Sequence, residues 1–207
     1  IPTTAGTGSE TTCWATIWDP ERDAKRSVEC QENYAWAALV DPELAAGMPL
    51  KLAVSSALDA VAHAVESYWA KGSNCVSRAL ALEAIRTVMG SMEDLLAGKP
   101  AAHDAMARGS MLAGLAFSNT KTTACHSISY PLTMHYGIPH GVAVSMLLSP
   151  VLQLNAPVLD EPAPLMAALG TADAEELGNK IRSYLTRSGQ AASLQAWGAK
   201  RAELPHM

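Results

Sequence analysis

The segment LAVSSALDAVAHAVESYW, residues 52–69, carries the strongest indication of fold and function in this chain. Its apolar residues recur at three- and four-residue spacing, which predicts a long helix. Asp59 and His63 interrupt the apolar pattern four residues apart, so they lie on one helical face, where a carboxylate and an imidazole can converge on one metal ion. The alternative is a hydrogen-bonded pair that satisfies a buried polar face.

Two later histidines extend this pair to a candidate metal site. His126 begins the string HSISY in an apolar helical stretch, and His140 lies in the tight turn PHG, where small neighbours let a cation come close. With Asp59 and His63 they provide one carboxylate and three imidazoles. This set suits Fe²⁺ or Zn²⁺ and leaves a coordination position open for substrate.

A glycine-rich stretch, PTTAGTGSE at residues 2–10, is the second signal. Its two glycines allow a tight turn whose backbone N–H groups face an anion, and its hydroxyls can bond a ribose or a phosphate. It lacks the third glycine of the dinucleotide fingerprint and the Gly-Lys-Ser/Thr of a P-loop. As an isolated string it is more often an ordinary turn.

The composition changes near residue 50. Before it, the β-branched and aromatic runs TTCWATIWD and KRSVEC flank the turn-prone residues 20–23 and predict two or three strands. After it, the spacing predicts helices over 52–69, 77–96, about 104–119, a helix from 124 that stops before Pro131 or bends there, 142–155, and two more in the tail. The chain thus reads as an α/β N-terminal remnant followed by an all-α helical domain.

Composition argues against several classes of protein. The chain has 207 residues, 49% hydrophobic and 17% charged, so a substantial core is expected. A net charge of -5 gives no field for gripping nucleic acid. No apolar stretch reaches the roughly 18 clean residues of a spanning helix, so we expect a soluble protein without a membrane partner. Four widely spaced cysteines favour a reducing, cytoplasmic setting.

Taken in order, four strings resemble the iron-containing (group III) alcohol dehydrogenase family. They are PTTAGTGSE at 2–10, DPEL at 41–44 followed by Pro49, LDAVAHAVESYWA at 58–70 and HSISYPLTMHYGIPHG at 126–141. The resemblance implies a dehydroquinate synthase-like fold and NAD(P)-dependent interconversion of an alcohol and an aldehyde or ketone. Residues 1–50 would end the nucleotide-binding α/β domain, and residues 51–207 would form the helical metal-binding domain. Because family members begin with a Rossmann-like segment that is absent here, we expect a truncated chain.

The resemblance also implies roles for individual residues. The residues that match the family's metal ligands are Asp59, His63, His126 and His140. Those that match its nucleotide-contacting loop are Thr3, Thr4, Gly6, Thr7 and Gly8, and Lys25 is similar to a lysine near the ribose of NAD or NADP. Tyr130 is a departure, because the family usually has a histidine there that is associated with proton exchange. Glu66 is either an outer partner of the site or a solvated or capping residue.

The stretch NTKTT at 119–123, directly before His126, suggests a substrate class. Lys121 with adjacent hydroxyls can receive a phosphonate, phosphate or carboxylate group, although a helix-surface charge is the usual role of a lone lysine. KTTACHSISYPLT, with WATIWD, is similar to the phosphonoacetaldehyde reductase branch of the family, which implies reduction of phosphonoacetaldehyde to 2-hydroxyethylphosphonate in phosphonate biosynthesis.

Two other functions stay open at this point. One is a metal-dependent lyase of the dehydroquinate synthase type, which also uses a bound metal and NAD. The other is a non-catalytic metal-binding fragment whose helices mediate oligomerisation. Net hydride transfer separates the dehydrogenase from the lyase, because the lyase regenerates its cofactor in each turnover. The resemblance makes a homodimer the expected assembly.

Overall fold

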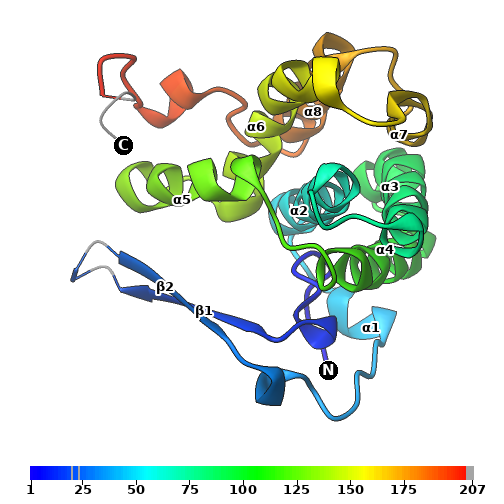
Figure 1. The fold of residues 1–207 in the computed structure, drawn as a ribbon. Coiled ribbons are helices and arrows are strands. Elements are labelled where there is room, and N and C mark those ends of the chain that lie inside the picture. The colour runs from blue at the N-terminus through cyan, green and yellow to red at the C-terminus, as the bar shows by residue number, and fades with distance from the viewer. Residues whose placement is uncertain (20, 23, 204–207) are drawn as a thin grey trace.

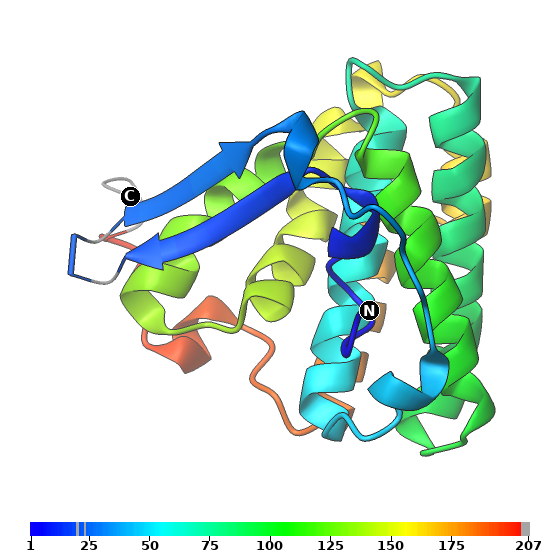
Figure 2. The same cartoon turned by 90° about the horizontal axis from the view of Figure 1, so that it is seen from below.

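The computed structural model describes residues 1–19, 21, 22 and 24–203. Two antiparallel strands, β1 (Trp14–Asp19) and β2 (Ala24–Glu29), precede the helices, so the N-terminal part holds two of the two or three expected strands. The predicted turn between them lies partly outside the described residues, at Pro20 and Asp23. The hairpin extends away from α2–α4 and crosses beneath α5 and α6 (Figures 1 and 2).

The other regular elements of the described chain are helices and short 3₁₀ turns. The α-helices are α1 (Pro42–Ala45), α2 (Leu50–Trp69), α3 (Cys75–Leu96), α4 (Ala101–Phe117), α5 (Ala124–Tyr136), α6 (His140–Asn155), α7 (Pro162–Leu169) and α8 (Ala174–Arg187). Short 3₁₀ turns are η1 (Ser9–Thr11), η2 (Gln31–Asn33), η3 (Ala156–Val158) and η4 (Leu194–Trp197). A small sheet followed by a helical domain is the architecture that the composition change near residue 50 predicts.

Helix α2 forms the centre of the core (Figure 1). It contacts α3, α4, α6 and α8, and it is buried almost without a break from Ala53 to Tyr68. A helix that is apolar all round must be covered on all sides, and the many alanines of α2 let its neighbours approach closely. The polar residues within this helix are therefore held in the interior, at a distance from bulk water.

Local signals account for several helix boundaries. The Asn74 side chain accepts from the backbone N–H groups of Val76 and Ser77, which starts α3 with a capping box. The Asp173 side chain accepts from Glu176 N at the start of α8. Gly137 ends α5 with a φ of 63°, a conformation that glycine adopts without steric cost.

Of the two alternatives predicted at Pro131, a stop or a bend, the stop is wrong. Helix α5 continues through this proline to Tyr136, where Gly137 ends it. Proline removes one backbone donor, and the carbonyl that loses its partner belongs to Ser127, an exposed residue that water can reach. Helix α5 packs against α6, and its residue Leu132, next after the proline, is buried; this burial favours continuing the helix.

The expectation that no stretch is long and apolar enough to cross a membrane is also wrong. Within the described residues, His140–Val158 meets that criterion by length and composition. These residues form α6 and η3, and 39% of the apolar window is buried inside the protein. Helix α6 packs against α2, α5 and α8, and its residues 141–145 are buried.

Candidate metal centre

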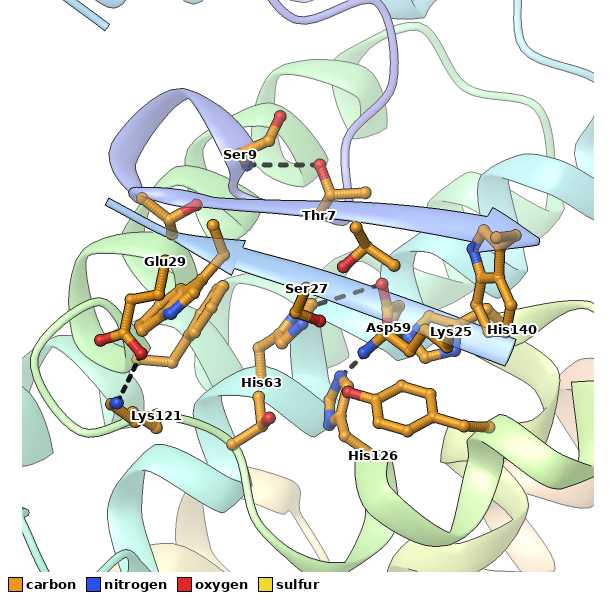
Figure 3. Close-up of a pocket in the computed structure, with 17 residues that line it drawn as sticks. Thr7, Ser9, Lys25, Ser27, Glu29, Asp59, His63, Lys121, His126 and His140 are labelled. Carbon is orange, nitrogen blue, oxygen red and sulfur yellow. Dashed lines mark hydrogen bonds and ion pairs between the residues drawn. The ribbon is translucent and has the colours of Figure 1, made fainter. Parts of the chain in front are cut away.

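A pocket of about 620 Å³ lies between the hairpin and the helices (Figure 3). Its floor consists of side chains from α2, α5 and the start of α6, and its opposite wall consists of side chains from both strands. The pocket is lined by all four predicted metal ligands, which are Asp59, His63, His126 and His140.

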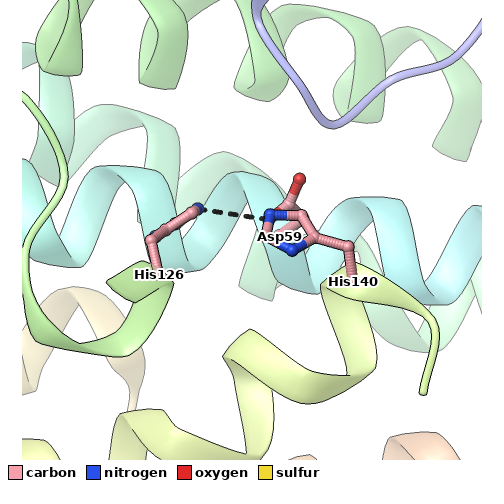
Figure 4. A group of neighbouring side chains, drawn as sticks. All are labelled: Asp59, His126 and His140. Carbon is pink, nitrogen blue, oxygen red and sulfur yellow. Dashed lines mark ion pairs between the residues drawn. The ribbon is translucent and has the colours of Figure 1, made fainter. Parts of the chain in front are cut away.

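Three of these residues bring potential ligand atoms together (Figure 4). One ligand atom each from Asp59, His126 and His140 lie within 4.8 Å of one another. Oδ1 of Asp59 is 3.5 Å from Nε2 of His126 and 3.8 Å from Nε2 of His140. The three side chains come from α2, α5 and the N-terminus of α6, so the fold creates a cluster that no single helix contains.

Two atoms of this cluster show that a cation fits it. Oδ1 of Asp59 and Nε2 of His126 are buried, and neither has a hydrogen-bond partner among the described residues. Leaving such atoms unsatisfied costs about 1–3 kcal/mol each, which is why buried polar atoms are normally paired. A metal ion between a carboxylate oxygen and imidazole nitrogens would satisfy both atoms at once.

His63 lies beside this cluster. Its ring stacks between Phe117 and His126, with centroid distances of 4.3 and 4.4 Å. Its Nδ1 is 3.9 Å from Oδ2 of Asp59 and 3.3 Å from the carbonyl oxygen of Gly6. The structure thus brings His63 into the pocket but not into the group of three ligand atoms.

The electrostatics of the cluster favour a bound cation. Burial lowers the pKa of His63 to about 4 and also lowers that of His140, so both rings are neutral and have a free nitrogen lone pair. Burial alone would raise the pKa of Asp59, but the surrounding histidines hold it well below its usual range, so this carboxyl is ionised. Burial would lower the pKa of His126, but the carboxylates of Asp59 and Glu66 raise it to about 9, which marks a position that favours positive charge.

Glu66 contacts one of the candidate ligands from the side away from the cluster. It is fully buried, and its carboxylate contacts Nδ1 of His126. It also accepts from Cys125 N at 2.7 Å, at the start of α5. Of the alternatives that the sequence left open, solvation of Glu66 is therefore wrong.

The predicted nucleotide-contacting residues lie in different places. Thr7 lines the pocket, whereas Thr3, Thr4, Gly6 and Gly8 are not among its lining residues. Gly8, with a φ of 57°, lies where an added Cβ would be 2.6 Å from the Cα of Gly114, so the loop packs directly on α4. Lys25 lines the pocket, with Nζ 3.2 Å from the centroid of the Tyr130 ring, and partial burial lowers its pKa to about 8.

Tyr130 and Lys121 also line the pocket. The Tyr130 ring stacks on the ring of His140 at a centroid distance of 6.0 Å, next to the ligand cluster. Lys121 Nζ donates to Oε2 of Glu29 at 2.7 Å, an ion pair that joins the loop before α5 to the end of β2. Lys121 thus has an acidic partner, and it faces the pocket as half of an ion pair.

Two family models match the chain. The model for iron-containing alcohol dehydrogenase matches residues 1–42, and the model for the C-terminal part of the Fe-containing alcohol dehydrogenase family matches residues 53–207. The chain belongs to the iron-containing alcohol dehydrogenase family. This confirms the resemblance of the four sequence strings.

Individual relatives of this dehydrogenase family agree with the assignment. The chain is 36% identical over 156 residues to lactaldehyde reductase of Escherichia coli K12, with 75% of this chain and 41% of that protein covered. It is 32% identical over 218 residues to sulfoacetaldehyde reductase of Bilophila wadsworthia, covering 99% and 56%. It is 34% identical over 157 residues to phosphonoacetaldehyde reductase of Streptomyces viridochromogenes, covering 75% and 40%.

Solved structures of the family confirm the predicted fold class. The crystal structure of sulfoacetaldehyde reductase from Bifidobacterium kashiwanohense in complex with NAD⁺ matches with a TM-score of 0.88 and 29% identity, covering 99% of this chain and 56% of that one. A 1,3-propanediol oxidoreductase structure matches with a TM-score of 0.88 and 31% identity, with the same coverage. The chain thus spans about half the length of these dehydrogenases.

Sequence reasoning missed the hairpin wall of the pocket. The strand residues that line it are Trp14, Thr16, Trp18, Lys25, Ser27 and Glu29. They are every second residue of each strand, and they form three cross-strand pairs: Trp14 with Glu29, Thr16 with Ser27, and Trp18 with Lys25. The period of two was visible in the sequence, but only Lys25 among them was expected at the site.

Proposed function

We propose that this chain is the catalytic part of a metal-dependent, NAD(P)-linked oxidoreductase that interconverts an alcohol and an aldehyde. The observation that carries the proposal is the pair of partnerless buried atoms, Asp59 Oδ1 and His126 Nε2, at the floor of the pocket. Three relatives also support the proposal, because each is named as an aldehyde reductase. None of these three names favours the lyase alternative. The complex of one structural relative with NAD⁺ supports the nicotinamide cofactor.

The residues that would hold Fe²⁺ or Zn²⁺ are Asp59, His126 and His140, with His63 as the fourth ligand. When bound, such an ion supplies a Lewis acid that polarises a carbonyl oxygen. The aromatic side chains of Trp18 and Tyr130 approach His140 from the hairpin and from α5 and form an apolar wall at this end of the pocket. Burial raises the pKa of Tyr130, so its hydroxyl keeps its proton in the neutral range and can donate a hydrogen bond to a substrate oxygen.

The cofactor would lie against the hairpin side of the pocket. Thr7 and Lys25 line this side and supply a hydroxyl and an ammonium group for a ribose or phosphate. Thr3, Thr4, Gly6 and Gly8 would then shape the loop that presents Thr7. We assign residues 1–50 to the end of a nucleotide-binding α/β domain and residues 51–207 to the helical metal-binding domain, a division supported by the separate family matches.

We propose further that the natural aldehyde carries an anionic group. Two of the relatives are named for sulfoacetaldehyde and phosphonoacetaldehyde, both small anionic aldehydes. In this chain Lys121 and Lys25 both line the pocket and can receive such a group. Reduction of phosphonoacetaldehyde to 2-hydroxyethylphosphonate, within phosphonate biosynthesis, is the reaction we favour.

The setting we propose is the cytoplasm, which the four free cysteines support. The assembly we propose is a homodimer, which sedimentation velocity would test.

The test combines metal content with turnover. Protein purified without added metal should contain one Fe or Zn per chain by mass spectrometry. It should then oxidise NADH or NADPH with phosphonoacetaldehyde, faster than with acetaldehyde as the neutral comparison. Equal rates with both aldehydes would keep the dehydrogenase and remove the anionic substrate. Bound metal without net hydride transfer would favour the non-catalytic fragment, and a protein without metal would overturn the proposed function.

A further inference from the structure

Glu66 is a fully buried carboxylate whose hydrogen bonds all converge on the start of α5. It follows His63 by three residues and Asp59 by seven on α2, so all three side chains project from one face of the helix. Its Oε1 accepts from Thr123 Oγ1 at 2.5 Å and from Cys125 N at 2.7 Å, and its Oε2 contacts Nδ1 of His126.

The position of the Glu66 carboxylate determines which nitrogen of His126 faces the metal cluster. Oε1 of Glu66 accepts from Cys125 N and from Thr123 Oγ1, and Oε2 is the oxygen that faces Nδ1 of His126 as an acceptor. Nδ1 of His126 must therefore carry the proton that it donates to Oε2. In the neutral ring this leaves the lone pair on Nε2, the atom that faces Asp59 Oδ1 and has no other partner.

A second layer of contacts holds Glu66 in place. Thr123 donates to Glu66, and in turn accepts from Nε1 of Trp69 at 2.8 Å. Trp69 is the last residue of α2, so the hydrogen bonds run from the end of α2 through the loop before α5 and back to Glu66 on α2. The indole N–H of Trp69 is thus the outermost donor in this chain of hydrogen bonds.

We propose that Glu66 is a positioning residue of the metal centre, which selects the His126 tautomer and aims Nε2 at the ion, with Thr123 and Trp69 holding the carboxylate in turn. The inference rests on the proposed metal site. Its chemical basis is general: a metal-bound histidine normally gives its other N–H to a carboxylate or carbonyl, which fixes the ring and increases its basicity.

Glu66 also satisfies a backbone N–H at the start of α5, so a purely structural role has to be separated from the positioning role. Glu66→Gln makes this separation. The amide keeps one oxygen that can accept from Thr123 and Cys125 N, while its NH₂ group cannot accept from Nδ1 of His126. The variant should fold with an unchanged circular dichroism spectrum but bind metal more weakly.

The experiment measures Zn²⁺ affinity by competition with a chromophoric chelator, together with the visible absorption spectrum of the Co²⁺-loaded protein. Glu66→Gln should lower Zn²⁺ affinity by about 10–100-fold and alter the Co²⁺ spectrum. Ser67→Ala is the matched control, because Ser67 is the next buried polar residue on α2 and accepts from Thr120 Oγ1 at 2.9 Å, away from the metal cluster. It should leave both readouts unchanged.

Thr123→Val keeps the experiment decisive if Glu66→Gln does not fold. Valine has nearly the shape of threonine but cannot donate to Glu66, so the loss of affinity should be smaller and in the same direction. Wild-type affinity in a folded Glu66→Gln protein, or in Thr123→Val where that variant alone folds, would overturn the positioning role and leave the metal site intact. A wild-type chain that binds neither Zn²⁺ nor Co²⁺ would overturn the metal site and the inference together.

Discussion

Nε2 of His126 and Oδ1 of Asp59 face each other at 3.5 Å in the interior, and neither has a hydrogen-bond partner in the described part of the chain. Helix α2 supplies the carboxylate and α5 the imidazole, and His140 reaches the same point from the first residue of α6. A cation bound between these three side chains would satisfy both partnerless atoms. Substitution of His126, His140 or His63 tests whether a cation binds there.

Removing either of two imidazoles should abolish tight metal binding without unfolding the protein. His126→Ala and His140→Ala each delete a nitrogen of the three-atom cluster. Removing a residue that only hydrogen-bonds to a ligand lowers metal affinity by about 10–100-fold, and the loss of affinity in these two variants should be larger. Metal content by mass spectrometry and far-ultraviolet circular dichroism check the two halves of this expectation. His103→Ala, at a histidine outside the pocket, is the control; full metal occupancy in either site variant would contradict the ligand assignment.

His63 can act as a fourth metal ligand or only as a stacking residue, and one substitution distinguishes these two roles. His63→Phe keeps an aromatic ring between Phe117 and His126 but removes both nitrogens. If His63 is a ligand, as we propose, the variant should keep its thermal stability and lose metal affinity. Isothermal titration with Zn²⁺ measures the difference. Unchanged affinity would reduce the ligand set to Asp59, His126 and His140.

The parts of the site that follow from helix periodicity could be predicted from the sequence. Asp59 and His63 share a face because the residues between them form a continuous helix, and an apolar helix of this length has few alternatives. The hairpin was also predictable from its β-branched and aromatic runs. The face of the hairpin that lines the pocket could not be predicted, because a mostly exposed hairpin has no buried face and therefore no alternation of apolar and polar residues.

Contacts between distant segments could not be predicted in this way. Glu66 contacts His126, which lies 60 residues later in the chain, and Lys121 contacts Glu29, which lies 92 residues earlier. Nothing in either local pattern specifies the partner, so the sequence leaves Glu66 open between two roles and does not indicate the acidic partner of Lys121. Pro131 is a different case: the local rule against proline in a helix is correct, but packing of α5 on α6 outweighs it.

Close contact between α6 and α2 depends on Gly141. An added Cβ there would lie 2.1 Å from the carbonyl oxygen of Ser55, which is backbone and cannot rotate away. Gly141→Ala should therefore destabilise the protein by about 1–3 kcal/mol, the usual cost of overpacking, and displace His140. Gly90→Ala is the control on α3, where a Cβ meets nothing within 4 Å, and it should stabilise by about 0.5–1 kcal/mol. Urea denaturation measures both, and equal stability of the two variants would contradict the close packing.

Glu29 should limit how strongly Lys121 binds an anionic substrate. The two side chains form a 2.7 Å ion pair within the pocket wall, so an incoming phosphonate must compete with the carboxylate of Glu29. Glu29→Gln should lower the KM for phosphonoacetaldehyde by a few-fold, since exposed ion pairs are weak, and leave the KM for acetaldehyde unchanged. Lys121→Met should have the opposite effect on the anionic aldehyde alone. Parallel changes for both aldehydes in steady-state assays would remove this pair from substrate selection.

Lys25 should titrate well below an ordinary lysine. Partial burial in the pocket lowers its pKa from 10.5 to about 8, because removing the ammonium from water disfavours its charged form. The amine is therefore protonated and unreactive below that pH and becomes a nucleophile above it. Acetylation with acetic anhydride, followed by peptide mass spectrometry at a series of pH values, should give a reactivity midpoint near 8 at this residue, against about 10.4 for lysine in a short peptide. A midpoint near the peptide value would show that water reaches Lys25 freely, and the hairpin would then not close this side of the pocket.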